Sequence, residues 1–451
     1  MEEQPTSSDH PSHQHESDHH EHDHDDHEHD SHEHDSHEHD SHEHGHDKDI
    51  RRRGGFIITA LTSGHGVFHW FSQSFTAMSP VVQDYFGLSF VAMGGIATTR
   101  EIASGLVTLP GGVIADAFRK YWGLILGLCM AFFGIGWLVV GLAPGYPALL
   151  VGMAIVGIAS SIWHLPAMAS LSHHFTRRRG TALSFHGVGG QVGDALAPPF
   201  TGLLLGFMAW KEIISIYAAV PLFLAFLVYW SFRYIGRDSQ DQDVSPSRNE
   251  QWQATKGVLR NRVLWVVAFV GGVRGMAFLA LVTFLPMFLR DLGMNALEWN
   301  LHLGLLMAVG IVSTPVVGYL SDRLGRKNVL VPGLLFLAVL AFFLSSATSG
   351  LGLILVIALL GTFLFGDQPV LTALALDVSE EGVATTVLGV LSFARFLFAA
   401  PSPIIAGIIY DNRGAGDTFL YVAALFVVGA VVLLFVPAPK TDFSAASGHH
   451  H

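Results

Sequence analysis

The stretch Gly318-Tyr-Leu-Ser-Asp-Arg-Leu-Gly-Arg-Lys327 separates two long apolar segments of this 451-residue chain. A looser version of the pattern, Gly112-Val-Ile-Ala-Asp-Ala-Phe-Arg-Lys120, separates two earlier apolar segments. The glycines Gly112 and Gly318 are 206 positions apart, and so are the aspartates Asp116 and Asp322. A repeat at this spacing predicts two tandem units of membrane helices.

The composition around this repeat defines the fold class. Hydrophobic residues make up 50% of the chain and charged residues only 14%. Because one helical crossing of a bilayer needs roughly 20 apolar residues, we predict an all-α membrane protein with twelve transmembrane helices in two six-helix bundles. The predicted spans are 55–82, 88–115, 121–143, 146–171, 180–206, 212–235, 263–290, 297–320, 328–346, 351–376, 382–410 and 416–437.

Basic residues concentrate in alternate loops, as in Arg177-Arg178-Arg179 and in the segment 236–262. Loops with an excess of lysine and arginine stay in the cytoplasm. We therefore predict a monomeric multi-pass protein of the cell (inner) membrane with both termini cytoplasmic. The single cysteine, Cys129, lies in an apolar segment, which excludes a disulfide.

These features predict five parts in the chain. They are a disordered cytoplasmic leader rich in His, Asp and Glu (1–53), an N-terminal six-helix bundle (54–235), a cytoplasmic linker (236–262), a C-terminal six-helix bundle (263–437) and a C-terminal tail (438–451). The closing Ser-Gly-His-His-His of the tail looks like part of an expression tag.

The leader contains three copies of the pentapeptide Asp-Ser-His-Glu-His, at 30–34, 35–39 and 40–44. Of the first 49 residues, 16 are histidine and 18 are Asp or Glu. Imidazole and carboxylate together suit borderline divalent metals such as Zn²⁺, Ni²⁺, Co²⁺ and Fe²⁺, so we predict a metal-binding tract. The alternative is a solubilising acidic tail, although a solvating tail needs only the acids. The candidate ligands in the repeats are His32, His34, His37, His39, His42 and His44.

Several histidines and one aspartate lie inside the apolar spans of the first half. Ionisable groups at membrane depth are costly and by default mark a transport pathway. His65 and His69 are four positions apart and therefore share one face of a helix, a spacing that suits one metal ion. His164, His186 and Asp194 lie in later spans. We predict that His65, His69 and His164 bind the metal, that His186 also contacts substrate, and that Asp194 exchanges a proton.

Charged residues inside the spans form a second group. Arg100 and Glu101 are adjacent, and Arg274, Asp367 and Arg395 lie in the second half. The 206-position offset places Arg274 opposite His69 and Asp367 within a turn of the position equivalent to His164. We predict that Arg274 and Asp367 contact substrate and that Glu101 or Asp367 carries a proton. Structural ion pairs, Arg100 with Glu101 and Arg274 with Asp367, are the alternative.

The Gly318–Lys327 stretch resembles the loop signature of the major facilitator superfamily, and its earlier copy resembles a degenerate form. Within that family, residues 145–210 look most like the fosmidomycin-resistance type of efflux permease. The resemblance rests on Ile162-Trp-His-Leu-Pro166 and on Gly187-Val-Gly-Gly-Gln-Val-Gly-Asp-Ala-Leu-Ala-Pro198. Leu165 departs from the family pattern, which places Pro directly after the histidine, and Met153 stands where many drug/proton antiporters carry an arginine.

The resemblance implies a central cavity lined by the first, fourth, seventh and tenth spans, which would place His65, His69 and His164 there. It also implies that the loop signatures latch one conformation, with a Gly that permits close helix contact and an Asp that pairs with basic residues. The residues that match this latch are Gly112, Asp116, Arg119, Gly318, Asp322, Arg323 and Arg326.

Three functions remain open. The first is export of a divalent transition metal (Ni, Co, Zn or Fe) from the cytoplasm by proton antiport, which the leader and the membrane histidines favour; His-rich tails also occur in nickel-resistance permeases of the superfamily. The second is efflux of an organic anion, a drug or a metal–carboxylate chelate, because Arg100, Arg274 and Arg395 would pair with an anion. The third is a metal sensor built on a transporter scaffold, which the lack of a signalling domain disfavours.

Enzymatic activity finds no support, because the sequence contains no nucleophile triad, phosphate-binding loop or cofactor motif. We expect no cofactor and no nucleic-acid partner. The expected partners are the small substrate, protons and the lipid bilayer.

Overall fold

The computed structural model describes residues 49–175, 178–235, 256–346, 350–379 and 384–436, without the side chains of 109–117 and 384–385. The chain divides into the units Met1–Lys48 and Asp49–His451. The first unit contains the histidines of the predicted metal-binding leader, which therefore lie outside the described residues. Most of the predicted linker and the C-terminal tail lie outside them too.

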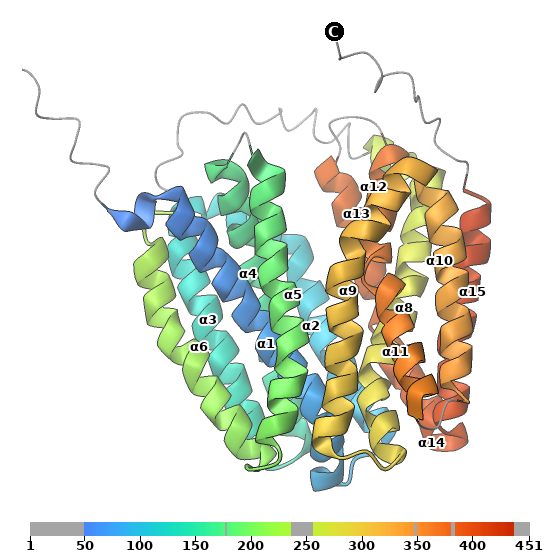
Figure 1. The fold of residues 1–451 in the computed structure, drawn as a ribbon. Coiled ribbons are helices and arrows are strands. Elements are labelled where there is room, and N and C mark those ends of the chain that lie inside the picture. Colours follow the sequence, from blue (N-terminus) through green and yellow to red (C-terminus); the bar gives the residue numbers. More distant parts are fainter. Residues whose placement is uncertain (1–48, 176–177, 236–255, 347–349, 380–383, 437–451) are drawn as a thin grey trace, which may run out of the picture. The chain divides into compact units, whose positions relative to one another are not determined.

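The described residues form helices and no strand, which confirms the predicted fold class (Figure 1). The helices of the first half are η2 (Ile50–Arg52), α1 (Gly54–Phe86), α2 (Phe90–Ala117), η3 (Arg119–Tyr121), α3 (Trp122–Gly141), α4 (Tyr146–His174), α5 (Arg179–Leu204) and α6 (Trp210–Phe232). Those of the second half are α8 (Arg262–Asp291), α9 (Ala296–Leu324), α10 (Arg326–Leu344), α11 (Gly350–Leu364), α12 (Asp367–Asp377), α13 (Ala384–Ala399), α14 (Ser402–Arg413) and α15 (Ala415–Leu434).

Two predicted spans are interrupted rather than continuous. The span 351–376 breaks between α11 and α12 at Phe365-Gly366, and the span 382–410 breaks between α13 and α14 at Ala400-Pro401. Proline lacks a backbone N–H and is accommodated best in the first turn of a helix, where that N–H has no partner within the helix. Pro369 lies in the first turn of α12, and Pro401 and Pro403 flank the start of α14. The prolines explain why new helices start there.

Nine helical segments among the described residues are long and apolar enough to cross a membrane. Helices α1, α2 and α5 also exceed the necessary length, with 33, 28 and 26 residues, but are less apolar. These three helices carry most of the ionisable residues singled out in the first half.

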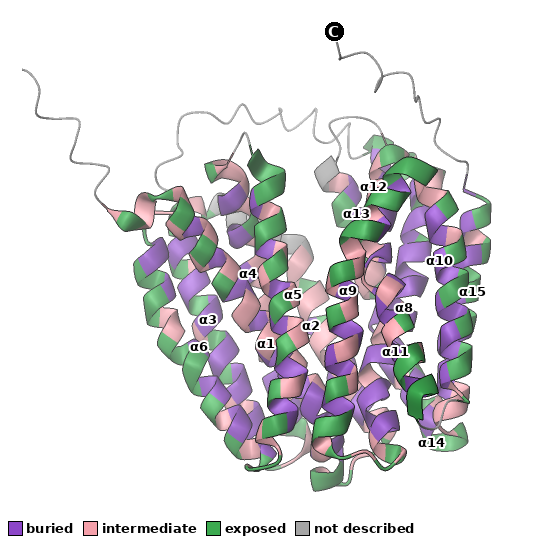
Figure 2. Ribbon diagram, in the orientation of Figure 1, coloured by how far each residue is buried: buried purple, intermediate pink, exposed green. Residues whose placement is uncertain are grey.

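Figure 2 shows exposed residues along the outward faces of the helices, and many of them are large and apolar, such as Phe223 and Phe226 on α6. Outward apolar side chains suit a protein surrounded by lipid.

Helices α5 and α9, and helices α2 and α14, join the two halves. Figure 1 shows α5 and α9 close together at one end and further apart at the other. The end of the molecule at which α1 is followed by α2 is here named the α1–α2 end. Among the described residues, every hydrogen bond between the two halves lies towards this end. One of them joins the Thr98 hydroxyl to the Ala400 carbonyl at 2.6 Å. The structure is therefore closed by bonds at the α1–α2 end.

Two contacts dominate that closed end. The Asp411 carboxylate accepts hydrogen bonds from the backbone N–H groups of Phe90 and Val91, at 2.9 and 3.0 Å, where α2 begins. A carboxylate is stabilised at this position by the unpaired N–H groups and the dipole of the helix. Arg290 of α8 forms an ion pair of 2.6 Å with Asp84 of α1.

Candidate functional site

The site begins with a close crossing of α1 and α5. A Cβ atom on Gly189 would lie 2.3 Å from the Thr62 carbonyl oxygen, and one on Gly193 would lie 2.4 Å from the Gly66 carbonyl oxygen. Any larger residue would therefore push the two backbones apart. The glycines in α5 bring its side chains directly against α1, and Thr62 pairs with Gly189 as Gly66 pairs with Gly193, so the two helices run in the same direction.

Three histidines converge at this crossing, two from α1 and one from α4. The Nε2 atoms of His65 and His164 are 3.0 Å apart. Ring nitrogens of His65, His69 and His164, one from each, all lie within 4.8 Å of one another. His65 is only 8% exposed, so most of its ring is held inside the protein. The structure thus brings together the three histidines that the sequence predicted as metal ligands.

Backbone carbonyl groups fix which nitrogen of each ring carries hydrogen. The Nδ1 of His65 lies 2.7 Å from the His186 carbonyl oxygen, and the Nδ1 of His164 lies 2.6 Å from the Ser160 carbonyl oxygen. A carbonyl oxygen only accepts hydrogen bonds, so each Nδ1 must donate. In neutral rings both Nε2 atoms are then bare, and their lone pairs face each other. This arrangement requires a cation, a proton or a metal ion, between the two nitrogens.

The third histidine is oriented by a carboxylate. The Nδ1 of His69 lies 2.9 Å from Oδ2 of Asp194 and donates to it, which leaves the Nε2 of His69 as its free nitrogen. The side chain of His69 remains 34% exposed and that of Asp194 18% exposed. The other oxygen of Asp194, Oδ1, is buried and has no hydrogen-bond partner among the described residues. In metal sites, ligand histidines usually donate their second N–H to a carboxylate or carbonyl in this way.

The spacing of the nitrogens favours one type of coordination. At a metal–nitrogen distance of about 2.0–2.1 Å, a separation of 3.0 Å corresponds to an N–metal–N angle of about 91–97°. That angle is closer to a square or octahedral arrangement than to the tetrahedral one of structural zinc, and nitrogen ligands in square geometry suit Ni²⁺ or Cu²⁺.

His186 of α5 lies against the same cluster. Its ring stacks on that of His65 with a centroid distance of 4.1 Å and an interplanar angle of 6°. The residue is 3% exposed, and neither ring nitrogen has a hydrogen-bond partner of normal geometry among the described residues. His186 thus lies beside the predicted ligands by stacking, and its predicted contact with substrate stays a prediction.

The pair Arg274 and Asp367 lies in the second half and forms a buried ion pair of 2.7 Å. Arg274 also donates to the Leu364 carbonyl, at the end of α11, and to the Gln368 side chain. Arg274 therefore ties together the two helices that meet at the α11–α12 break. Both side chains are occupied with each other in this structure, and their roles in substrate and proton binding stay predictions.

Arg395 of α13 differs from Arg274. It makes no hydrogen bond or ion pair within the described part of the chain, but the charges of Glu101, Arg100 and Arg274 all act on it. Its guanidinium packs 5.3 Å from the ring centre of Phe396. An ion pair between Arg100 and Glu101 was the alternative that the sequence left open; the structure contains no hydrogen bond or ion pair between these two side chains, and the charge of Glu101 lies near Arg395.

The residues of the predicted latch in the second half contact other residues of that half. Arg326 pairs with Asp322 and, at 3.3 Å, with Asp377, and Arg323 packs over the ring of Tyr319. The close helix contact expected at Gly318 is absent, because a Cβ on Gly318 would have no neighbour within 4 Å. Gly318 lies at the end of α9 away from the bonded α1–α2 end, which explains the open space.

The first copy of the latch is described only in part. The surroundings of Gly112 and the side chain of Asp116 are not among the described parts of the chain. The guanidinium of Arg119 packs 5.4 Å from the ring centre of Trp122.

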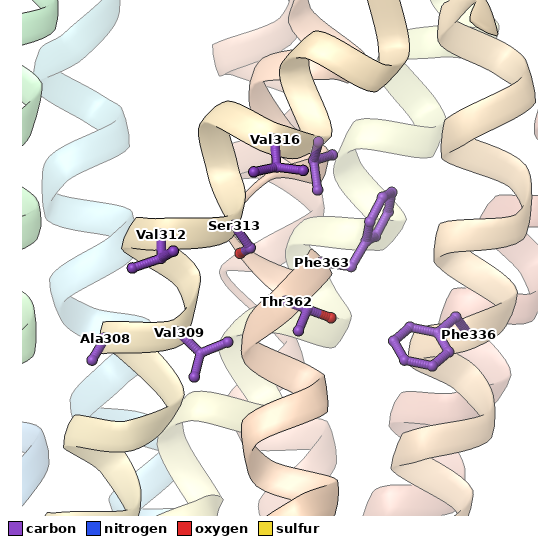
Figure 3. Close-up of a pocket in the computed structure, with 9 residues that line it drawn as sticks. Ala308, Val309, Val312, Ser313, Val316, Phe336, Thr362 and Phe363 are labelled. Atoms are coloured by element: carbon purple, nitrogen blue, oxygen red, sulfur yellow. The ribbon is translucent and has the colours of Figure 1, made fainter.

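A pocket of about 750 Å³ lies away from the histidines, among α9, α10 and α11 (Figure 3). Its lining is mostly apolar, with Val309, Val312 and Val316 on α9 and Phe336 on α10. Such a lining offers the hydroxyl groups of Ser313 and Thr362 but no imidazole or carboxylate, and the histidine cluster on α1, α4 and α5 remains the better candidate site.

Sequence reasoning missed the groups that fix the histidine rings. The carbonyl oxygens of Ser160 and His186 carry no sequence signal, because every residue has a carbonyl group. The glycines at 189, 190 and 193 did provide a signal, since they indicated a close helix approach beside Asp194.

Comparison with known proteins agrees with this fold. Residues 61–403 match the family described as Major Facilitator Superfamily. The chain is 25% identical over 379 residues to the uncharacterised MFS-type transporter YfnC of Bacillus subtilis (strain 168), covering 82% of this chain and 91% of that protein. It is 24% identical over 279 residues to the fosmidomycin resistance protein of Escherichia coli (strain K12), covering 61% and 67%.

A solved structure is similar as well. A bacterial homologue of the human lysosomal transporter Spinster, in an inward-facing and occupied conformation, superposes with a TM-score of 0.72 at 18% identity. The match covers 85% of this chain and 96% of that one. At this identity the likeness concerns the fold alone.

Proposed function

This chain belongs to the major facilitator superfamily, and we propose that it exports a divalent transition metal from the cytoplasm in exchange for protons. Membership makes it a multi-pass secondary transporter of the membrane and not an enzyme. Ni²⁺ is the preferred substrate of the proposal, with Co²⁺, Zn²⁺ and Fe²⁺ as the related ions.

One observation carries the proposal: the bare Nε2 atoms of His65 and His164, 3.0 Å apart, need a cation between them. A third imidazole, that of His69, is held by a carboxylate beside them. Three imidazoles without a thiolate suit borderline divalent metals. The expected site is therefore His65, His69 and His164, with further coordination positions left to water or to Asp194.

The direction follows from the predicted topology. If the basic loops and the leader lie in the cytoplasm, the bonded α1–α2 end faces outwards, and this structure is a state that loads from the inside. The leader would then collect metal on the loading side and supply it to the transporter. Asp194, whose carboxylate already accepts from His69, is the preferred residue for proton exchange, and Glu101 and Asp367 are the alternatives.

A second candidate is efflux of an organic anion, a drug or a metal–carboxylate chelate. The observation in its favour is Arg395, a cation inside the helical bundle that has no hydrogen bond to a described residue. A carboxylate or phosphonate would pair with such a guanidinium, whereas a bare metal ion would be repelled by it.

Transport into inside-out vesicles tests the proposal. Vesicles with the wild-type protein should accumulate Ni²⁺ when a proton gradient, acidic inside, is imposed. Asp194→Asn should keep metal binding but remove the dependence on the gradient. Arg395→Ala separates the two candidates, because a carrier of bare metal should tolerate it and a carrier of anions should not. If the wild-type vesicles accumulate none of the four metals, metal export is excluded.

A further inference from the structure

His186 occupies an unusual environment for a buried imidazole. It is 97% buried, as its 3% exposure shows, yet neither ring nitrogen makes a hydrogen bond of normal geometry to a described residue. The Leu61 carbonyl lies near one ring nitrogen, and the other nitrogen has no hydrogen-bond partner among the described residues. The hydroxyl of Thr62, which contacts α5 at Gly189 one turn after His186, also lacks a partner.

A buried histidine without hydrogen bonds is unfavourable for stability if the residue serves only for packing. Buried polar groups are nearly always hydrogen-bonded, and leaving one unpaired costs about 1–3 kcal/mol. The stacking on His65 needs only a flat ring, which phenylalanine would supply without that cost. An imidazole with a free nitrogen is therefore expected to serve for binding.

The histidines and Asp194 follow one another along the length of α1 and α5. Helices α1 and α5 run in the same direction, and Gly190, one turn beyond His186, contacts the His65 ring. Asp194 follows at the level of His69. His186 is thus nearest to the end at which α1 and α5 begin, followed by His65 with His164 and then by His69 with Asp194.

We propose that His186 is a transfer ligand, which binds the metal ion before it reaches the site between His65 and His164. This inference rests on the proposed metal export and assigns a separate step to this residue. The parallel rings, 4.1 Å apart, let an ion pass from a nitrogen of His186 to the Nε2 of His65 without losing all protein ligands. A transfer ligand speeds entry and contributes little to affinity at the final site.

The test compares rate with affinity in the full-length protein. His186→Phe keeps a flat ring for stacking and removes both nitrogens. Ni²⁺ alone is the probe, with binding measured by titration of purified protein and transport measured as initial uptake into inside-out vesicles. We expect the initial rate to fall at least about tenfold while the equilibrium affinity changes by less than about threefold, since only a step on the path is lost. His302→Phe, which replaces a half-buried histidine near the start of α9, is the matched control and should change neither quantity.

Three results would overturn the inference. A wild-type rate in His186→Phe would show that stacking is the only role of the residue. A loss of affinity as large as that of His65→Ala would make His186 a member of the final site. If wild-type protein neither binds nor transports Ni²⁺, the proposed function itself fails, a result distinct from the other two.

Discussion

The Nε2 atoms of His65 and His164 face each other at 3.0 Å, while the Nδ1 of each ring donates to a backbone carbonyl group. Neither ring can turn to relieve the contact without losing its hydrogen bond. The backbone of α4 and α5 therefore holds two lone pairs in position for one cation. This relationship distinguishes the cluster from histidines that merely pack together.

Removing either member of this pair should abolish high-affinity metal binding. We expect His65→Ala and His164→Ala each to weaken Ni²⁺ binding by at least about 100-fold, because the facing pair of Nε2 atoms loses one member and loss of a mere supporting group already costs about 10–100-fold. Titration of the purified protein with Ni²⁺ measures the effect. His302→Ala controls for the loss of a histidine elsewhere. Wild-type affinity in both variants would remove the metal site from the interpretation.

The glycine at 190 should be necessary for the geometry of the cluster. A Cβ atom there would lie 2.7 Å from Cε1 of His65 and 3.0 Å from Cδ2 of His69. Gly190→Ala should therefore displace both rings and lower Ni²⁺ uptake at least about tenfold, as small displacements of reacting groups commonly do. Gly187→Ala is the matched control, because a Cβ there meets nothing within 4 Å. Equal uptake by the two variants would contradict the role given to the crossing.

The bonds at the α1–α2 end should hold the structure closed on that side. Asp411→Ala removes the carboxylate that accepts from Phe90 and Val91, so the state open at that end should become more populated. A cysteine at Ala77, which is 0% exposed, reports the opening when introduced with Cys129→Ser. Its labelling by a thiol reagent should be faster in the Asp411→Ala background. Asp417→Ala, which removes an exposed ion pair within one half, should leave the labelling rate unchanged.

The ion pair between Arg274 and Asp367 should contribute to stability. Arg274→Ala leaves the carboxylate of Asp367 buried without its partner, and breaking a buried pair in this way costs about 3–5 kcal/mol. Thermal unfolding in detergent should therefore shift to a clearly lower temperature. The double variant Arg274→Ala with Asp367→Ala should recover part of the loss, because no charge is left unpaired. Unfolding at the wild-type temperature in Arg274→Ala would show that water or other groups solvate the carboxylate.

The leader should bind metal weakly and be dispensable for the transport step. Imidazole must be neutral to bind, and with an unperturbed pKa of about 6.5 its binding should fade below about pH 6. Deletion of residues 1–48 leaves Asp49, whose carboxylate accepts from Arg51 at the start of the described chain. We expect the shortened protein to retain transport in vesicles and to lose the additional metal ions seen by titration. Complete loss of transport despite normal membrane insertion would place the leader in the transport path.

The sequence by itself determined the features that depend on local composition. Apolar segments long enough to cross a bilayer, separated by charged or proline-rich loops, located the helices, because burial in lipid acts on each segment independently. The spacing of His65 and His69 determined that both lie on one face of a helix. The interruptions before Asp367 and at Pro401 were missed, since an apolar run looks the same whether its helix is continuous or broken.

Only the tertiary structure decided which ionisable groups meet. His65, His164 and Asp194 come from three helices, and their distances depend on how closely α5 crosses α1 and on the rotation of each helix. The same holds for Arg274, which is occupied by Asp367, and for Arg395, which is not. Above all, the hydrogen positions on His65 and His164 follow from two backbone carbonyl groups, and these exist at every residue. Their effect appears only when packing brings them within hydrogen-bonding distance of a ring.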